Sequence, residues 1–485
     1  MSPLLLFSFV IGYFLLLLVV AYFTSRNSNN ESFFIGNRNS NWMLVAFGMI
    51  GTSLSGVTFV SVPGTVGTES FSYFQIVIGN VIGYAVVAYV LLPIYYRMNL
   101  TSIYNYLQGR LGVASYKTGA SFFLLSRVLG ATARLYLVVN ILHSMILQNF
   151  NLPFWVGALV ILLMILLYTF EGGVKTIVWT DTLQTACMLI GLVVCVCYIL
   201  HHLDIGLVQG AQALSERGWS DIFVTDPSSK FFFIKQIAAG AFISITMTGM
   251  DQEMMQKNIS VKTLKDSQKN MMTFALIFMG VVLLFLFLGG LLHLFAESKG
   301  IAAKSDALFP TIALNYMPGI VSIIFIIALI SALFPSADGA ITALTSSFCI
   351  DIMGMQRRGD WTEAKKKKFR QRVHLVFAFI FLLFVLVFRW ANSPSMIGII
   401  LKIAAYTYGP LLGLFSFGIL TKRMVDDKAV PVICILSPVI CFLLDTFQST
   451  IFGSFKIGLE LLIINGLITF AGLLLISKRK HPGTN

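Results

Sequence analysis

Several ionisable side chains stand inside long apolar runs of this 485-residue sequence. A charge at the centre of a lipid bilayer costs about 3 kcal/mol, so each of them needs a partner or a task. Arg127 and Arg134 are seven residues apart and share one helix face, where they could pair with buried acids or bind an anionic solute. Asp181 and Lys402 could instead be helix-end groups, whereas Asp338 has no helix end nearby.

The apolar run at 42–67 is unusually rich in glycine and hydroxyl residues. These small residues are Gly48, Gly51, Thr52, Ser53, Ser55, Gly56, Thr58 and Ser61. Non-helical backbone at membrane depth is tolerated only where protein encloses it or where it lines a wet cavity. Close helix packing through small residues would explain the pattern. We favour a broken helix whose free carbonyls and hydroxyls bind an ion or a solute.

The run at 231–252 has the same character and lies five apolar runs later. Its polar residues are Ser244, Thr246, Thr248, Gly249, Asp251 and Gln252. Two interrupted spans at corresponding places in two halves are typical of an inverted repeat with a binding site at the membrane midplane. The spacing therefore predicts two five-span repeats.

The ninth apolar run contains a proline beside two oxygen-bearing side chains. Pro335 cannot donate a hydrogen bond to the carbonyl of Ser331, so that oxygen is left free. Ser336 and Asp338 lie next to it. Carbonyl, hydroxyl and carboxylate oxygens suit a hard monovalent cation, so we predict a sodium site here. A proline kink packed against neighbouring helices is the alternative.

Composition identifies the elements that must position these residues. Hydrophobic residues make up 57% of the chain and charged residues only 11%, whereas about a quarter of a soluble protein is charged. We therefore expect an all-α integral membrane protein and exclude a soluble enzyme or a disordered chain. A spanning helix needs about 20 apolar residues. The expected spans are 3–23, 42–67, 72–96, 118–147, 154–170, 178–201, 231–252, 270–295, 319–349, 373–390, 395–421, 429–447 and 457–476.

The net charge of +13 is distributed as an orientation signal. Basic residues gather in alternate loops, above all at 357–372, whereas the long loop 202–230 is acidic. The positive-inside rule then places the N-terminus outside and the C-terminus in the cytoplasm. The basic cluster lies between two apolar runs and fits this orientation signal, so we expect no nucleic-acid partner. This orientation assigns Lys257 to a cytoplasmic loop.

The six cysteines include no Cys-x-x-Cys motif, so we predict neither a metal site nor a disulfide framework.

The stretch 171–184 resembles a signature of the sodium/solute symporter family, with its glycine pair followed by Trp179, Asp181 and Gln184. The segments 248–252 and 406–410 are also similar to that family, and the resemblance covers nearly the whole chain. It implies a LeuT-type five-plus-five inverted repeat with one extra helix before it and two after it. The expected division of the single transporter domain, 1–485, is 3–23 (accessory), 42–201 (first repeat), 231–421 (inverted second repeat) and 429–476 (accessory).

The resemblance also implies roles for individual residues. The first broken helix is most similar to that of the sialic acid transporters. The implied substrate-binding residues are Ser53, Ser55, Thr58, Asn80, one of Arg127 and Arg134, and, from the two shorter motifs, Thr248, Gln252 and Tyr406. The implied ligands of a first sodium ion are Gly51, Leu54, Ala332, Pro335 and Ser336, although Pro335 lacks the hydroxyl that the family has there. Asp181 and Asp338 would serve a second sodium ion, with Gly339 replacing a serine.

These expectations define a transporter rather than an enzyme. The predicted activity is sodium-coupled symport of a small organic solute, an organic anion such as a sialic acid or a monocarboxylate, by alternating access. A sugar or amino-acid symporter and a substrate sensor with the transporter fold are the alternatives. Sodium is the expected ion, and the lipid bilayer is the expected surrounding. We expect a functional monomer that crosses the plasma (inner) membrane many times.

Overall fold

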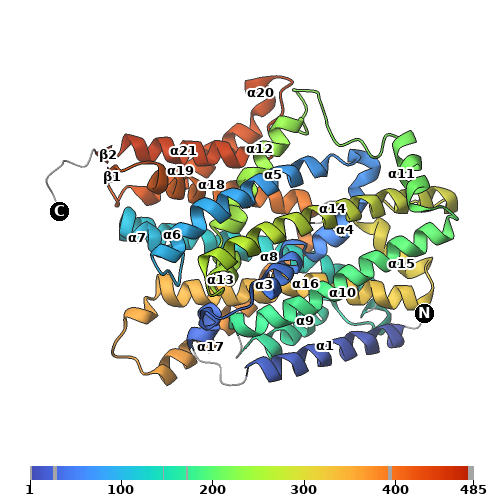
Figure 1. Cartoon of the computed structure of the whole chain (residues 1–485), viewed down its shortest axis with the longest axis horizontal. Helices are drawn as coiled ribbons and strands as arrows, with labels where there is room; N and C mark the ends of the chain where they lie inside the picture. The colour runs from blue at the N-terminus through green and yellow to red at the C-terminus, as the bar shows by residue number, and fades with distance from the viewer. Residues whose placement is uncertain (1–2, 26–29, 146, 171–172, 392–395, 479–485) are drawn as a thin grey trace.

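The computed structural model describes residues 3–25, 30–145, 147–170, 173–391 and 396–478. Long helices run side by side along one axis of the molecule (Figure 1). The start of α1 and the short helix α11 lie at one end of this bundle, while α7 and the strands β1 and β2 lie at the other (Figure 1). The described chain therefore begins and finishes at opposite ends of the bundle.

Eight helical segments are long and apolar enough to cross a membrane, as judged over the described residues. Their helices are α1 (Pro3–Ser25), α5 and α6 (Tyr73–Val86, Leu92–Arg97, joined by η2, Val87–Leu91), α8 (Val113–Met145), α10 (Gly173–His202), α14 (Leu264–Lys299), α16 (Gly319–Ser347), α17 (Glu363–Ala391) and α18 (Met396–Leu420). Three shorter apolar helices are α9 (Phe154–Thr169), α19 (Val430–Thr446) and α21 (Leu461–Leu475).

Two further spans are helix pairs with a sharp bend, as the small polar residues predicted. In the first, α3 (Trp42–Ser53) meets α4 (Gly56–Glu69) at 58°. In the second, α12 (Phe233–Ser244) continues through η4 (Ile245–Gly249) and meets α13 (Gln252–Ile259) at 65°. The predicted breaks in these two spans are confirmed.

Local chemistry explains why the chain breaks at these points. Leu54 leaves the helical conformation (φ −88°, ψ 64°) between Ser53 and Ser55, two residues that compete with helical backbone bonds. At the second break the Asp251 carboxylate accepts hydrogen bonds from the amides of Glu253 at 2.9 Å and Met254 at 3.2 Å, which caps the new helix.

The remaining elements are short and connect the spans. They are α2 (Asn30–Ile35), η1 (Gly36–Arg38), α7 (Asn105–Arg110), η3 (Leu147–Phe150), α11 (Leu207–Glu216), η5 (Ser305–Ala307), α15 (Leu308–Asn315), η6 (Phe348–Ile352), η7 (Met355–Arg357), α20 (Gln448–Phe452), β1 (Met424–Val425) and β2 (Ser477–Lys478). The two strands pair antiparallel, with Met424 opposite Lys478.

Several helices extend beyond the apolar runs that predicted them. For example, α17 begins at Glu363 rather than at residue 373, so the basic residues 365–372 lie on its first turns instead of in a loop. The difference arises because hydropathy marks only the apolar part of a helix, whereas lysine and arginine are good helix formers. The centre of the bundle is α16, whose residues 328–347 are all buried, and it packs against α3, α8 and α10.

Candidate functional site

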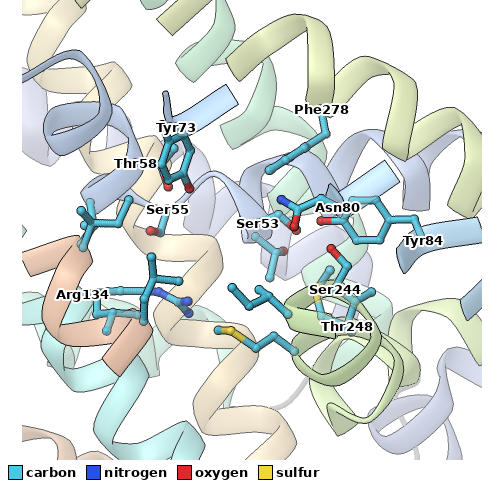
Figure 2. Close-up of a pocket in the computed structure, with 18 of the residues that line it drawn as sticks. Ser53, Ser55, Thr58, Tyr73, Asn80, Tyr84, Arg134, Ser244, Thr248 and Phe278 are labelled. Carbon is cyan, nitrogen blue, oxygen red and sulfur yellow. The ribbon is translucent and has the colours of Figure 1, made fainter. Parts of the chain in front are cut away.

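A polar cavity lies between the two broken spans (Figure 2). It encloses about 740 Å³ of space, its open mouth included. Side chains from α3, α4, α5, α8, α12, η4, α13, α14 and α18 form its wall. The predicted substrate residues that line it are Ser53, Ser55, Thr58, Asn80, Arg127, Arg134 and Thr248. Their role in binding stays a prediction, but the fold brings these seven side chains together.

The two arginines of α8 have different surroundings. Arg127 is buried and forms ion pairs with Glu253 and, at 3.7 Å, with Asp251. Arg134 makes no ion pair or hydrogen bond with any other described residue, and its guanidinium points into the cavity (Figure 2). Internal pairing therefore accounts for the first arginine, whereas the second is available for a ligand.

Asn80 joins the two sides of the cavity wall. With its amide in the orientation that its neighbours require, Nδ2 donates to Oγ of Ser244 at 3.0 Å and to the carbonyl of Gly240 at 2.8 Å. The helices α5 and α12 can approach so closely because Gly79 and Gly240 face the partner backbone. A Cβ atom on Gly240 would lie 2.1 Å from the carbonyl oxygen of Ile76.

Four prominent lining residues were not among the predicted site residues. Tyr73, Tyr84, Ser244 and Phe278 surround the cavity together with the predicted hydroxyl residues (Figure 2). Ser244 was visible only as one of several polar residues in its span. The aromatic residues carry no signal in the sequence, because a tyrosine or phenylalanine in an apolar span is ordinarily a packing residue.

Two predicted substrate residues lie away from the cavity. Oε1 of Gln252 accepts from the amide of Ile103 at 3.0 Å, and its Nε2 donates to the carbonyl of Thr101 at 3.0 Å. The hydroxyl of Tyr406 donates to Asp445 at 2.7 Å. Gln252 follows the 65° bend and so faces a different direction from Thr248.

The carboxylate of Asp445, which accepts from Tyr406, also lies 2.7 Å from the ammonium of Lys402. Asp445 therefore holds Tyr406 and Lys402 in one cluster. A structural ion pair thus accounts for the charge predicted at residue 402.

The first break offers free oxygen atoms to a cation. The amide of Leu54 donates to Ile50 at 2.8 Å, and among the described residues no donor reaches the carbonyls of Gly51 and Leu54. α16 lies beside this point, since a Cβ atom on Gly51 would be 3.5 Å from Cγ of Pro335. Ser336 supplies the hydroxyl, which donates to Leu333 at 2.8 Å and keeps its lone pairs. With the carbonyl of Ala332 on α16, these oxygens are of the types that sodium prefers, and Pro335 adds no hydroxyl; their role as sodium ligands stays a prediction.

The second break is satisfied by the protein itself. The hydroxyl of Tyr95 donates to the carbonyl of Gly249 at 2.7 Å, and that of Tyr104 donates to the carbonyl of Met250 at 2.9 Å. Buried carbonyls without a partner are costly, and these two phenols remove that cost. The two breaks therefore differ in chemistry, because the carbonyls of the second have donors, whereas those of the first have none in the described part of the chain.

The residues do not fit a second sodium ion at Asp181. Its Oδ2 atom lies 2.6 Å from Nζ of Lys257, which is buried rather than in the predicted cytoplasmic loop. Oδ2 of Asp338 accepts a hydrogen bond from Tyr168 at 2.7 Å. A positively charged side chain thus lies where the resemblance placed a metal ion.

The chain as a whole is similar to known transporters. The sodium/sialic acid symporter SiaT of Proteus mirabilis is 24% identical over 480 residues, which cover 94% of this chain and 92% of that protein. The sodium-coupled monocarboxylate transporter 1 of Xenopus laevis is 25% identical and covers 86% of this chain, with 66% of its own length matched.

Solved structures agree on the fold. A sodium-coupled sialic acid symporter in a substrate-bound outward-open state has a TM-score of 0.84 at 20% identity, covering 98% of this chain and 99% of that one. Mhp1, a nucleobase-cation-symport-1 family transporter, has a TM-score of 0.56 at 13% identity, with 93% and 94% covered. The predicted LeuT-type transporter fold is therefore confirmed. Since the model of the sodium:solute symporter family matches residues 33–432, the chain belongs to that family.

Proposed function

We propose that this protein is a sodium-coupled symporter for a small hydroxylated organic anion, such as a sialic acid. The observation that carries the proposal is the guanidinium of Arg134, which faces the cavity without a partner among the described residues. A half-buried, unpaired arginine inside a membrane-spanning bundle favours an anion as its ligand. Its planar guanidinium can bind a carboxylate through two hydrogen bonds.

The rest of the lining favours a ligand with several hydroxyl groups. Ser53, Ser55, Thr58, Ser244 and Thr248 supply hydroxyls around the same cavity. A plain monocarboxylate is the second candidate, supported by relatives that transport monocarboxylates and by apolar lining residues on α18. It would leave most of these hydroxyls without a hydrogen bond, which is why we place it second.

Coupling follows from the position of the first break. The carbonyls of Gly51 and Leu54 would hold sodium, while Ser53 and Ser55 in the same segment face the solute cavity. Each ligand then orders the backbone that the other needs, which is positive coupling between ion and solute. A sensor with the same fold would bind solute without this dependence. A neutral sugar has no charge for the unpaired arginine to bind, and an amino acid would bring an ammonium group for which the described cavity lining supplies no carboxylate.

We further propose the two repeats as 42–201 and 231–421 and a functional monomer in the plasma membrane. The N-terminus would be outside and the C-terminus in the cytoplasm. The basic loops support this orientation, as does the position of the described chain ends at opposite ends of the bundle (Figure 1).

The test is uptake of labelled sialic acid by proteoliposomes with an inward sodium gradient. Arg134→Ala should raise the solute concentration for half-maximal uptake by about 10- to 100-fold, the equivalent of one lost charged hydrogen-bond pair. Arg134→Lys should lose less, because it keeps the charge without the fork. The matched control is Tyr406→Phe, whose side chain lies outside the cavity and should leave uptake unchanged.

Two results would contradict the proposal. Solute flux that ignores the sodium gradient would exclude sodium-coupled symport. If the protein takes up an uncharged sugar, and Arg134→Ala takes it up as well as wild type does, an anionic substrate would be excluded. Preference for lactate-sized acids over sialic acid, with Arg134 still required, would favour the monocarboxylate candidate.

A further inference from the structure

Lys257 places an ammonium group between three helices in the middle of the bundle. Its Nζ atom donates to Oδ2 of Asp181 on α10 at 2.6 Å and to Oγ1 of Thr52 on α3 at 2.6 Å. It also lies 3.8 Å from Oε1 of Glu253, one turn earlier on its own helix α13. The ammonium therefore links both broken spans to α10.

These groups are sealed from solvent. The side chain of Lys257 is 4% exposed, and those of Asp181 and Glu253 are 0% and 2% exposed. Oδ1 of Asp181 and Oε1 of Glu253 have no hydrogen-bond partner among the described residues. Without the ammonium the site would hold two buried carboxylates beside a hydroxyl, which is the donor chemistry of a cation site.

The ammonium and a sodium ion cannot share this position. Oδ2 of Asp181 and Oγ1 of Thr52 already face Nζ at hydrogen-bonding distance. A second unit charge about 4 Å from the ammonium would be repelled by about 4 kcal/mol at the effective dielectric constant typical of proteins. A bound ion would also leave during the transport cycle, whereas the lysine remains attached to the chain.

We propose that Lys257 is a tethered cation that takes the place of a second sodium ion, so that transport is coupled to one sodium ion only. This inference rests on the proposed symport. The lysine neutralises Asp181 and holds α3, α10 and α13 together in every state in which a bound ion would otherwise be required. Sodium then acts at the first break alone, through the carbonyls of Gly51 and Leu54.

The test removes the ammonium and counts sodium ions in two ways. The first is the Hill coefficient of solute uptake as a function of sodium concentration. The second is the increase of the melting temperature with the logarithm of sodium concentration, measured without any solute. In wild type we expect a Hill coefficient near 1. Lys257→Met should admit a second sodium ion at Asp181, which raises the Hill coefficient toward 2 and steepens the thermal shift because two sites contribute.

Two variants provide controls. Lys257→Met combined with Asp181→Asn removes both charges and should return the Hill coefficient and the thermal-shift slope to wild-type values. Lys262→Met removes an exposed lysine five residues away and should change neither value.

The proposal is overturned if wild type has a Hill coefficient near 2 that Asp181→Asn lowers to 1, since sodium would then bind Asp181 beside the lysine. It is equally overturned if Lys257→Met folds and keeps the wild-type sodium slopes. Should Lys257→Met fail to fold, Asp181→Asn alone decides, because its sodium slopes must match wild type. If no solute is transported at all, the proposed function fails, while the thermal shift still reports the number of sodium ions bound.

Discussion

Replacing Arg127 with methionine would reveal which carboxylate depends on it. The side chain is 5% exposed, and its partners Asp251 and Glu253 are 0% and 2% exposed. Asp251 keeps three other donors, namely the hydroxyl of Tyr408 at 2.5 Å and the amides of Glu253 at 2.9 Å and Met254 at 3.2 Å. Within the part of the chain that the structure describes, the Glu253 side chain keeps only the ammonium of Lys257, at 3.8 Å. In Arg127→Met, the negative charge of Glu253 would therefore be the one left buried without a close positive partner.

The magnitude follows from this asymmetry. Breaking a buried ion pair by removing one partner costs about 3–5 kcal/mol, because a charge is left buried and uncompensated. Since Asp251 stays hydrogen-bonded, we expect Arg127→Met to cost about 3 kcal/mol, near the lower limit. Adding Glu253→Gln should recover about 2 kcal/mol, because a neutral amide is far cheaper to bury. Adding Asp251→Asn instead should recover little.

The measurement is thermal unfolding of the purified protein in detergent at one fixed scan rate, since such unfolding is often irreversible. A loss of about 3 kcal/mol corresponds to a fall in melting temperature on the order of 5 °C for a chain of this size. The reasoning is refuted if Asp251→Asn rescues Arg127→Met as well as Glu253→Gln does, or if Arg127→Met leaves the melting temperature unchanged.

Two further predictions concern helix packing and sodium. Gly240→Ala should force α5 and α12 about 1 Å apart, because its Cβ would lie 2.1 Å from the carbonyl oxygen of Ile76, at a cost of about 1–3 kcal/mol. Its melting temperature should fall and the half-saturating solute concentration should rise as Asn80 and Ser244 separate; no change in either would contradict the packing argument. Ser336→Ala should raise the half-saturating sodium concentration of uptake by about tenfold with maximal uptake retained, and unchanged sodium dependence would remove Ser336 from the sodium site.

The residues at the helix breaks were predictable because the same small and hydroxyl residues that interrupt the helix also provide the side chains at the interruption. Small and hydroxyl residues interrupt the apolar run at 42–67, and the side chains at an interruption must face protein or a cavity. Ser53, Ser55 and Thr58 therefore lie on the cavity wall as expected. The same reasoning placed Thr248 there.

The ionic contacts were not predictable from the sequence. Arg127 and Arg134 are on one helix stripe, and only the position of α13 decides which of them meets carboxylates. Glu253 and Lys257 follow the end of an apolar run, where hydropathy indicates a loop, yet the tertiary fold buries them. Gln252 is adjacent in sequence to the second break but belongs to the helix beyond the bend, so sequence proximity to Thr248 did not make it part of the site.

The contrast between the two breaks locates the ion-dependent step. At the second break, Tyr95 and Tyr104 donate hydrogen bonds to the carbonyls of Gly249 and Met250, and Asp251 caps the helix that follows. At the first break, the carbonyls of Gly51 and Leu54 have no such donors among the described residues. A cation can therefore change the stability of the first broken span but has nothing comparable to act on at the second. Because Ser53 and Ser55 belong to that first span, the proposed sodium ion and solute would act on the same broken backbone.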